Sequence, residues 1–486
     1  MERPPAGMPV SCLPQARPLY LVADDRGVAP LLAAKFATVG IATQVVSVAP
    51  ADATHLVVLS GLNRCPTPQD VEREIFGLFS QLRNCAAALR AGGGLFVTVQ
   101  DTGGAFAAHH CDGQQAWLGG LAAFAKTAGR EWPQLAVKAI DVAFTDPETV
   151  AASLFEELMG GGPEREVGLG ENRTTPSPIA VAAPLGRSPF NDGDVLVVSG
   201  GARGVAAECV LALAACQPLR LGLLGRSVLV EESRELARLA DETALRQHFI
   251  ASASGKATPM EINRQVSRIM ASREVRSTLA NLTALGCEAR YKTVDVTQTA
   301  ALEAALDSLR QDWGAIHGVI HAAGVLRDKA IADMTPDQFA IVFRTKVDGL
   351  RALLRVTQPD TLKLLCCFSS IAARVGNPGQ LNYNVANTTL NAVCLAEKVR
   401  RPDCVVKSIG WGAWDGGMVT PALKRHFEAQ GVDLIGRQTG ARAFVAEVFA
   451  GADSAVEVLL TGALGRGFAS LAGHIIHREN HGEKDV

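Results

Sequence analysis

The sequence predicts an α/β fold in which two doubly wound parallel sheets follow one another along the chain, the second carrying the chemistry. Two observations predict this fold. Short β-like runs alternate with helix-like stretches throughout the 486 residues, a pattern typical of parallel sheets wrapped by helices. Between about residues 160 and 190, a stretch rich in Gly, Pro and polar residues interrupts the alternation and divides the chain into two halves.

This division predicts the domain organisation. The Pro-rich residues 1–16 are expected to form a disordered tail, and residues 474–486 a second tail. Between them we expect a structural subdomain over residues 17–186, with a linker from about residue 160, and a catalytic subdomain over residues 187–473. Both subdomains are predicted to be Rossmann-like, the first of them degenerate.

The first half repeats the alternation without the motifs of a cofactor site. Its expected strands are "PLYLVAD", "THLVVLSG", "GLFVTVQD" and "LAVKAIDV", and residues 70–93 have helical period with a glycine stop. The turn after the first strand, "DDRGVAP", lacks the several glycines of a pyrophosphate-binding turn, and no Ser/Tyr pair follows the later strands. We therefore expect this half to be structural.

The second half shows the alternation more clearly. Its expected strands, separated by helix-length segments, are "DVLVVS", "RLGLL", "ARYKTVDV", "IHGVIHAAG", "LKLLCCFSS", "CVVKSIGWG" and "VEVLLTG". Sequential βα units of this kind bind their ligands at the carboxyl ends of the strands. We therefore look for site residues at these strand ends.

A long segment between the second and third of these strands predicts a helical insertion over about residues 232–284. Thr258, Pro259 and Glu261 have the spacing of a capped helix start. The insertion is either a structural element on the surface or a docking surface for a partner domain, and we favour the first.

Composition excludes several classes of function. The chain is 48% hydrophobic and 20% charged, and its 47 Lys and Arg against 49 Asp and Glu leave a net charge of −2, which gives no electrostatic case for binding nucleic acid or an anionic membrane. Apolar runs are too short to span a bilayer, the N-terminus lacks a signal-peptide core, and the cytoplasm is the expected location. The 11 cysteines show no metal-site spacing, so we expect no metal, and reduced thiols in the core.

The stretch "VVSGGARGVAAE" places Gly200, Gly201 and Gly204 between a strand and a helix. A tight turn of this kind brings the backbone close to a pyrophosphate and points the helix N-terminus at it. Glycines that serve only the turn are the alternative. The same turn contains further candidate cofactor contacts, namely Ala202, Arg203 and Val205.

The second strand of this half ends in "LGLLGRS". An acidic residue at this point favours a free ribose 2′-hydroxyl, whereas an arginine suits a 2′-phosphate, so Arg226 and Ser227 favour NADPH over NADH. A solvated arginine at a strand end is the alternative. The ends of the next two strands add the candidate cofactor contacts Asp295, Val296, Ala322, Ala323 and Gly324.

Seven sequence elements resemble the short-chain dehydrogenase/reductase superfamily, and more closely the ketoreductase domains of type I polyketide synthases. They are "SGGARGVA", "GRS", "VDV", "HAAGVLRD", "FRTKVDG", "FSSIAARVGNPGQLNYNVAN" and "GWGAWDGGM", over about residues 194–418. In the first half, "LAAFAKTAGREWPQLAVKAIDV" resembles part of the structural subdomain of those ketoreductases. The insertion and "GVLRDKAI" are similar to ketoreductases of polyunsaturated-fatty-acid synthases.

Reduction of a ketone needs a positioned hydride donor, a proton for the oxygen and stabilisation of the developing charge. Tyr383 is the natural proton donor, and the family spacing selects Ser370 as the second hydroxyl. Four residues after Tyr383, where many of these reductases carry lysine, stands Asn387. The resemblance implies that Lys346 supplies the lysine instead. It would bind the nicotinamide ribose and lower the phenol pKa by its charge, with Asn387 holding a water or the lysine in place.

The resemblance also bears on stereochemistry. Leu326 and Asp328 match a Leu-x-Asp signature, and the position eight residues before the tyrosine, which is Trp in the opposite class, is Val375. Both imply a B-type enzyme that gives a 3R, D-configured hydroxyl. Met418 begins an expected mobile helix over the substrate, and Trp411 either lines the pocket or packs in the core.

Together these features predict an NADPH-dependent β-ketoacyl reductase. The implied substrate is a 3-oxoacyl thioester on an acyl carrier protein, and the implied partners are other domains of a polyketide or fatty-acid synthase. A redox-silent epimerase and a non-catalytic structural domain of the same fold are the alternatives.

Overall fold

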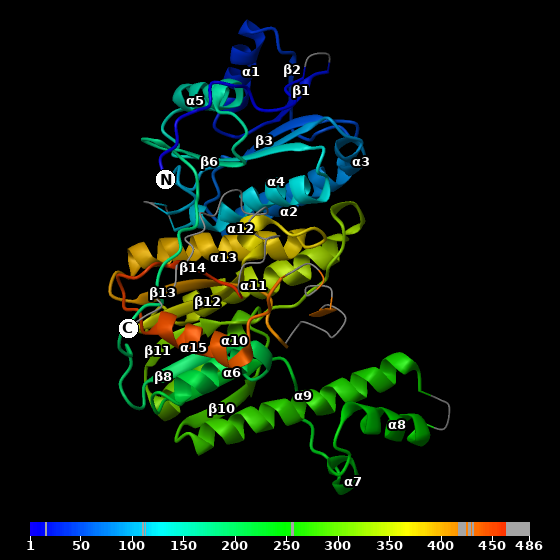
Figure 1. The fold of residues 1–486 in the computed structure, drawn as a ribbon, viewed down its shortest axis with the longest axis vertical. Helices are drawn as coiled ribbons and strands as arrows, with labels where there is room; N and C mark the ends of the chain where they lie inside the picture. The colour runs from blue at the N-terminus through cyan, green and yellow to red at the C-terminus, as the bar shows by residue number, and fades with distance from the viewer. Residues whose placement is uncertain are drawn as a thin grey trace, which may run out of the picture.

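The computed structural model describes the chain except for residues 15–16, 109–110, 112, 254–256, 417–423, 426–428, 430–431 and 463–486. In the described part, the chain forms two sheets of seven strands each, one in either half, and helices cover both faces of each sheet (Figure 1). This is the predicted α/β architecture of two Rossmann-like subdomains. Among the described helices, none combines the length and the apolar character needed to cross a membrane.

The first sheet has the strand order β2-β1-β3-β4-β5-β6-β7, and only the β6–β7 pairing is antiparallel. Helices α1 and α5 pack on one face and α2 and α4 on the other. The elements are β1 (Leu19–Val22), α1 (Val28–Thr38), β2 (Thr43–Val46), β3 (His55–Gly61), α2 (Pro68–Asn84), α3 (Ala86–Arg90), β4 (Leu95–Gln100), the 3₁₀ helix η1 (Gln115–Leu121), α4 (Ala122–Glu131), β5 (Ala136–Val142), α5 (Pro147–Gly160), β6 (Glu166–Leu169) and β7 (Arg173–Thr174).

The second sheet has the order β10-β9-β8-β11-β12-β13-β14 and is parallel throughout. All seven of its strands were predicted. The elements are β8 (Val195–Ser199), α6 (Gly204–Ala214), β9 (Arg220–Gly225), α7 (Arg234–Ala237), α8 (Glu242–Ser252), α9 (Pro259–Ala284), β10 (Glu288–Thr293), α10 (Thr299–Trp313), β11 (Ile316–His321), the 3₁₀ helix η2 (Ile331–Asp333), α11 (Pro336–Val356), β12 (Leu364–Ser370), α12 (Ala372–Val375), α13 (Leu381–Arg400), β13 (Val405–Trp411), α15 (Arg437–Val448) and β14 (Glu457–Leu460).

The ends of the first subdomain differ from the expectation. Strands β6 and β7 lie inside the segment predicted as a linker. The segment predicted as a disordered tail pairs with β7, because Glu2 forms a β-bridge with Thr174. Val10 is buried in the core between the sheet and α1 and α5. Strands of two and four residues carry too little alternation to be recognised in sequence, and their unpaired edge supplies partners for the first residues.

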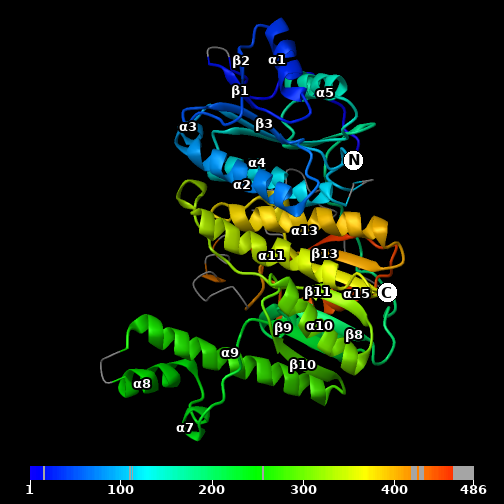
Figure 2. The same cartoon turned by 180° about the vertical axis from the view of Figure 1, so that it is seen from behind.

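The two subdomains share one apolar core. Helices α2, η1 and α4 of the first subdomain lie against α11 and α13 of the second (Figure 2). The ring of Phe79 on α2 stacks on that of Phe339 on α11, with ring centroids 4.4 Å apart. A Cβ at Gly119 of η1 would lie 2.4 Å from the Cβ of Ala392 on α13, so only glycine allows this close approach. The first subdomain is therefore packed against the helices that support the second sheet.

The predicted insertion consists of helices α7, α8 and α9, and it projects from the body of the second subdomain (Figure 1). Helix α9 begins as expected, because Thr258 and Glu261 exchange side-chain to backbone hydrogen bonds around Pro259. The far end of α9 packs on α8 through a small apolar cluster that includes Leu245, Ile262 and Val266. Its near end lies beside α6, at the start of the predicted cofactor site.

Candidate active site

A cleft of about 2020 Å³ lies at the carboxyl ends of the strands of the second sheet. Most of the predicted site residues line it: Gly200, Ala202, Arg203, Gly204, Val205, Arg226, Ser227, Asp295, Val296, Ala322, Ala323, Gly324, Leu326, Asp328, Lys346, Ser370, Val375, Tyr383 and Trp411. Gly201 and Asn387 lie behind the cleft wall, and Met418 lies outside the described residues. The parallel topology explains this convergence, because every strand of such a sheet ends at the same edge.

The turn after β8 requires glycine at two of its positions for different reasons. Gly200 has a φ of +74°, and a Cβ there would lie 2.9 Å from the backbone nitrogen of Ala323. A Cβ at Gly201 would lie 2.2 Å from a side-chain carbon of Val198, so this glycine serves the packing beneath the turn. Helix α6 starts at Gly204, so its first amides, which have no partner within the helix, lie at the cleft.

The ends of β9 and β10 bring a cation and an anion together at the mouth of the cleft. Nη1 of Arg226 lies 3.9 Å from Oδ2 of Asp295, and both side chains are substantially exposed. The other carboxylate oxygen of Asp295 accepts hydrogen bonds from the backbone and hydroxyl of Thr297. The carboxylate is therefore held by its own turn, and the guanidinium keeps only a long ion pair with it.

A histidine connects the end of strand β8, just before the glycine turn, to the helix that carries the predicted lysine. The ring of His321 is fully buried, with Nδ1 2.7 Å from Oγ of Ser199 and Nε2 2.8 Å from the backbone carbonyl of Lys346. Burial, together with the charge of Lys346, lowers the pKa of His321 to about 3. The ring is therefore neutral, with Nε2 donating to the carbonyl. The sequence reasoning assigned no role to His321, although it stands in the quoted "HAAG" motif.

Lys346 enters the site from α11. Its side chain is 3% exposed, and its ammonium donates a hydrogen bond of 2.8 Å to the carbonyl of Phe368 on β12. The Nζ lies 5.5 Å from the ring centroid of Tyr383. Burial lowers the pKa of Lys346 to about 8. This lysine therefore changes its charge close to neutral pH.

Tyr383, Ser370 and Asn387 meet where β12 and α13 lie side by side. Oγ of Ser370 accepts a hydrogen bond of 3.2 Å from the amide of Ala372, and Nδ2 of Asn387 donates one of 2.8 Å to the carbonyl of Tyr383. Oδ1 of Asn387 is buried and, within the described part of the chain, has no hydrogen-bond partner. A buried acceptor of this kind is suited to a water molecule.

The pKa of Tyr383 corrects one expectation. Burial raises this pKa, the side chains of Asn387 and Ser370 oppose the shift, and the charge of Asp328 adds to it. The net shift is therefore upward, and the lowering that we expected from Lys346 is not found. The physical reason is burial, because a phenolate in this enclosed position loses its hydration, and this loss outweighs the hydrogen bonds that favour the charged form.

The predicted stereochemical residues line the part of the cleft beside the tyrosine. Oδ2 of Asp328 accepts a hydrogen bond of 2.8 Å from Gln380, and Val375 ends the short helix α12. Trp411 and Trp414 pack edge to face, with ring centroids 4.9 Å apart. Both tryptophans are buried in the core and also line the cleft. The two roles considered for Trp411, lining the pocket and packing in the core, are therefore compatible.

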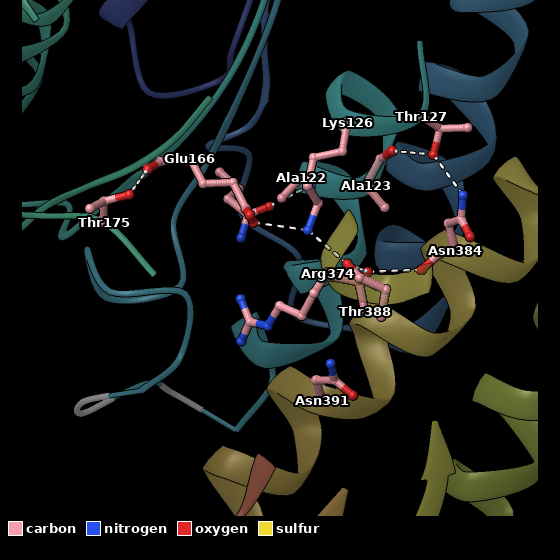
Figure 3. A network of polar contacts seen from close by, with 12 residues as sticks. Ala122, Ala123, Lys126, Thr127, Glu166, Thr175, Arg374, Asn384, Thr388 and Asn391 are labelled. Carbon is pink, nitrogen blue, oxygen red and sulfur yellow. Dashed lines mark hydrogen bonds and ion pairs between the residues drawn. The ribbon is translucent and has the colours of Figure 1, made fainter. Parts of the chain in front are cut away.

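Helix α4 of the first subdomain also contributes to the site, which the sequence reasoning did not expect. The ammonium of Lys126 donates to the carbonyl of Ala373 at 2.7 Å and to the carboxylate of Glu166 at 2.9 Å (Figure 3). The carboxylate of Glu131 accepts a hydrogen bond from the amide of Gly379 at 2.8 Å. Because Ala373 and Gly379 lie between Ser370 and Tyr383, the first subdomain holds the segment that joins the two hydroxyl-bearing residues.

Comparison with known proteins agrees with this geometry. Residues 194–416 match the family model described as the KR domain. One of the chains that make up a polyunsaturated fatty acid synthase of a Thraustochytrium species is 37% identical over 346 residues, which are 67% of this chain and 12% of that much longer protein. That synthase therefore extends far beyond the part that this chain spans.

Two solved structures show the same fold. A ketoreductase domain from the bacillaene assembly line has a TM-score of 0.69 at 18% identity, covering 94% of this chain and 96% of its own. A ketoreductase from the first module of phoslactomycin biosynthesis in Streptomyces sp. HK803 has a TM-score of 0.69 at 20% identity, covering 97% of this chain and 94% of its own. Residues 194–416 of this chain therefore belong to the KR domain family, and the two sheets together have the fold of solved ketoreductase domains from polyketide assembly lines.

Proposed function

We propose that the chain reduces the β-keto group of a 3-oxoacyl thioester to a 3-hydroxyacyl thioester, with NADPH as hydride donor and an acyl carrier protein as carrier. The observation that carries the proposal is that Lys346, Ser370 and Tyr383 lie together at one cleft within a KR domain. The proposed partners are other domains of a polyketide or fatty-acid synthase, which the match to a polyunsaturated fatty acid synthase supports.

The residues of the cleft fit a nicotinamide dinucleotide. The absent Cβ of Gly200 leaves the turn open where a side chain would press on the Ala323 backbone, and Arg203 and Arg226 offer cationic donors to phosphate. When bound, the cofactor supplies the hydride. The residues proposed to hold it are Gly200, Gly201, Ala202, Arg203, Gly204, Val205, Arg226, Ser227, Asp295, Val296, Ala322, Ala323, Gly324, Lys346 and Tyr383.

The proposed roles of the four catalytic residues follow from their protonation states and contacts. Tyr383, whose raised pKa keeps the phenol protonated at neutral pH, donates its proton to the substrate oxygen. The Ser370 hydroxyl donates a hydrogen bond to the same oxygen. The Lys346 ammonium stabilises the charge left on the phenol oxygen of Tyr383. The buried Oδ1 of Asn387 holds a water molecule that links this ammonium to the phenol.

These roles predict that activity falls on the basic side of about pH 8. The rate constant kcat/KM reports on the groups of the free enzyme, and Lys346 loses its proton at a pKa of about 8. Below this pH the ammonium is present and active, and above it the neutral amine no longer stabilises the phenolate. We expect kcat/KM for NADPH-dependent reduction, measured from pH 6 to pH 10, to decline about tenfold per pH unit beyond this break.

The matched variant is Lys346→Arg, because a guanidinium stays charged throughout this range. Whatever activity Lys346→Arg retains should show no decline near pH 8. A wild-type profile that stays flat up to pH 9.5, or an unchanged break in the arginine variant, would contradict the role given to Lys346.

Stereochemistry is part of the proposal. The presence of Leu326 and Asp328 in the cleft, with Val375 in place of a tryptophan, supports a B-type enzyme and a 3R product. The hydrogen bond from Gln380 holds Asp328 at the cleft, where its carboxylate can bias the side from which the thioester enters.

One assay tests the function directly. Purified protein with NADPH and a 3-oxoacyl N-acetylcysteamine thioester should consume NADPH, which is followed by absorbance, and chiral chromatography should find the 3R alcohol. Protein without thioester is the control. Folded protein that binds NADPH but consumes none of it would contradict the reductase proposal, and a 3S product would contradict the B-type assignment.

The alternatives have their own readouts in the same experiment. An epimerase would exchange the α-proton of a 2-methyl-3-oxoacyl thioester for deuterium without consuming NADPH. A structural domain would do neither. The set of Lys346, Ser370 and Tyr383 at the cleft favours a catalytic over a structural domain, and the glycine turn at the same cleft, which fits a cofactor, favours reduction over epimerisation.

A further inference from the structure

Helix α9 of the insertion contacts the predicted phosphate-binding turn directly. One carboxylate oxygen of Glu274 accepts a hydrogen bond of 2.8 Å from the backbone amide of Gly204, and the other accepts one of 2.7 Å from Nε of Arg203. One helical turn further along α9, the hydroxyl of Thr278 donates a hydrogen bond of 3.0 Å to the carbonyl of Ala202. Three consecutive residues of the turn are thus held by one face of α9.

The carboxylate of Glu274 contacts donors that are typical of an anion-binding site. The amide of Gly204 is the first of the free N–H groups at the start of α6, and such groups bind phosphate oxygens. Arg203 adds a forked cationic donor that suits carboxylate and phosphate alike. Glu274 therefore uses two donors that a phosphate group of the cofactor would also use.

The contact is not a buried structural ion pair. The side chains of Arg203 and Glu274 are 46% and 42% exposed, and both line the cleft. Exposed pairs of this kind contribute little to stability, so an incoming anion can replace the carboxylate at small cost. Thr278, in contrast, is 4% exposed, and its hydrogen bond to Ala202 does not involve a charge. Displacement of Glu274 would leave α9 attached through Thr278.

We propose that Glu274 competes with a phosphate group of the nicotinamide cofactor for Gly204 and Arg203, and that it thereby sets the affinity of the cofactor site. The proposal rests on the proposed function only in that a phosphate-bearing cofactor binds at this turn. It assigns the insertion a role in the site, where the sequence alone favoured a structural element on the surface.

The test measures cofactor binding and does not depend on turnover. The dissociation constant of NADPH, from its fluorescence on titration with protein, should fall about tenfold or more in Glu274→Gln, because the amide keeps the size of the side chain and loses its charge. Glu235→Gln is the matched control. Glu235 lies on α7 of the same insertion, and its side chain is 75% exposed. This variant should bind NADPH as the wild type does.

Two further ligands identify the phosphate that competes. If the 2′-phosphate displaces Glu274, affinity rises for NADPH and for 2′,5′-ADP but not for NADH. If the pyrophosphate displaces Glu274, the affinity for NADH rises as much as the affinity for NADPH. Both results support displacement. Thr278→Val, which removes the neutral contact, should lower the melting temperature without tightening NADPH binding.

Unchanged or weaker NADPH binding in Glu274→Gln would overturn the inference, since it would mean that Glu274 anchors the insertion or orients Arg203. This outcome is separable from failure of the proposed function. If the protein reduces the thioester but Glu274→Gln does not tighten NADPH binding, the proposed function stands and the inference is wrong. If Glu274→Gln tightens NADPH binding but the protein reduces no thioester, the inference stands and the proposed function is wrong. If neither the wild type nor any variant binds NADPH or NADH, both are wrong.

Discussion

Tyr383→Phe is expected to lower kcat for NADPH-dependent reduction of a 3-oxoacyl thioester by about 100- to 10,000-fold, the usual contribution of a positioned general acid. The change removes one oxygen atom, and the ring is expected to stay in place beside Lys346 at the cleft. The backbone carbonyl of residue 383 also remains available to Asn387. Folding and NADPH binding should therefore be close to those of the wild type.

The measurement separates chemistry from binding. kcat comes from NADPH absorbance at saturating thioester, and the dissociation constant of NADPH comes from fluorescence. Tyr20→Phe is the matched control, because Tyr20 lies on β1 of the first sheet, away from the cleft. If Tyr383→Phe keeps more than a tenth of the wild-type kcat, another group supplies the proton, and the mechanism proposed for this cleft is wrong.

Lys126→Met is expected to produce the second large effect, on stability and on catalysis together. The side chain of Lys126 is 5% exposed, and its ammonium joins the carboxylate of Glu166 to the carbonyl of Ala373 (Figure 3). Removing it takes the hydrogen-bonded cation away from a largely buried carboxylate, which keeps the more distant charge of Arg374, and this should lower the free energy of unfolding by about 3 kcal/mol. Urea denaturation measures this loss.

The catalytic part of the effect comes from Ala373. This residue lies between Ser370 and Tyr383. After the substitution, its carbonyl keeps the hydrogen bond of 3.1 Å from the hydroxyl of Thr388, which also lies 2.8 Å from the carbonyl of Asn384. A small displacement of this segment should lower kcat about tenfold, since a misplacement of an ångström can cost up to about 100-fold. The dissociation constant of NADPH should not change, because the phosphate turn lies on other strands.

Two variants control this prediction. Lys35→Met on α1 removes a lysine from the far side of the same subdomain and should change neither stability nor kcat. The double variant Lys126→Met/Glu166→Gln should regain part of the lost stability, because it leaves no unpaired carboxylate. A fall in kcat without recovery of stability in the double variant would show that Lys126 acts through something other than its ion pair.

Much of the second subdomain could be predicted because its strands, turns and motifs are each defined by residues that are close together in the sequence. The seven strands follow from short apolar runs, and the turn follows from the spacing of Gly200 and Gly204 between a strand and a helix. Tyr383 and Ser370 could be placed because each lies at a fixed distance from an element that the pattern defines. Parallel topology then brought these residues to one edge of the sheet, as expected.

Less of the first subdomain could be predicted. The short strands β2, β6 and β7 carry too few residues for an alternation, and β6 and β7 fall among glycines and charges that predict a linker. Helix α4 was recognised as part of a structural subdomain, but nothing in its sequence shows that Lys126 and Glu131 hold the segment between Ser370 and Tyr383. These contacts join residues more than 240 positions apart in the chain.

Local sequence is enough to specify the fold class, the strands of the second sheet and most of the residues around the cleft, because periodicity, glycine turns and motif spacing are properties of neighbouring residues. Which protons these residues hold, and what surrounds them, depends on how the chain packs. The pKa values of Lys346, His321 and Tyr383 shift mainly through burial, and burial is a property of the folded molecule. In the same way, Glu274 reaches the glycine turn at the start of α6 only because α9 packs beside α6 in the folded chain.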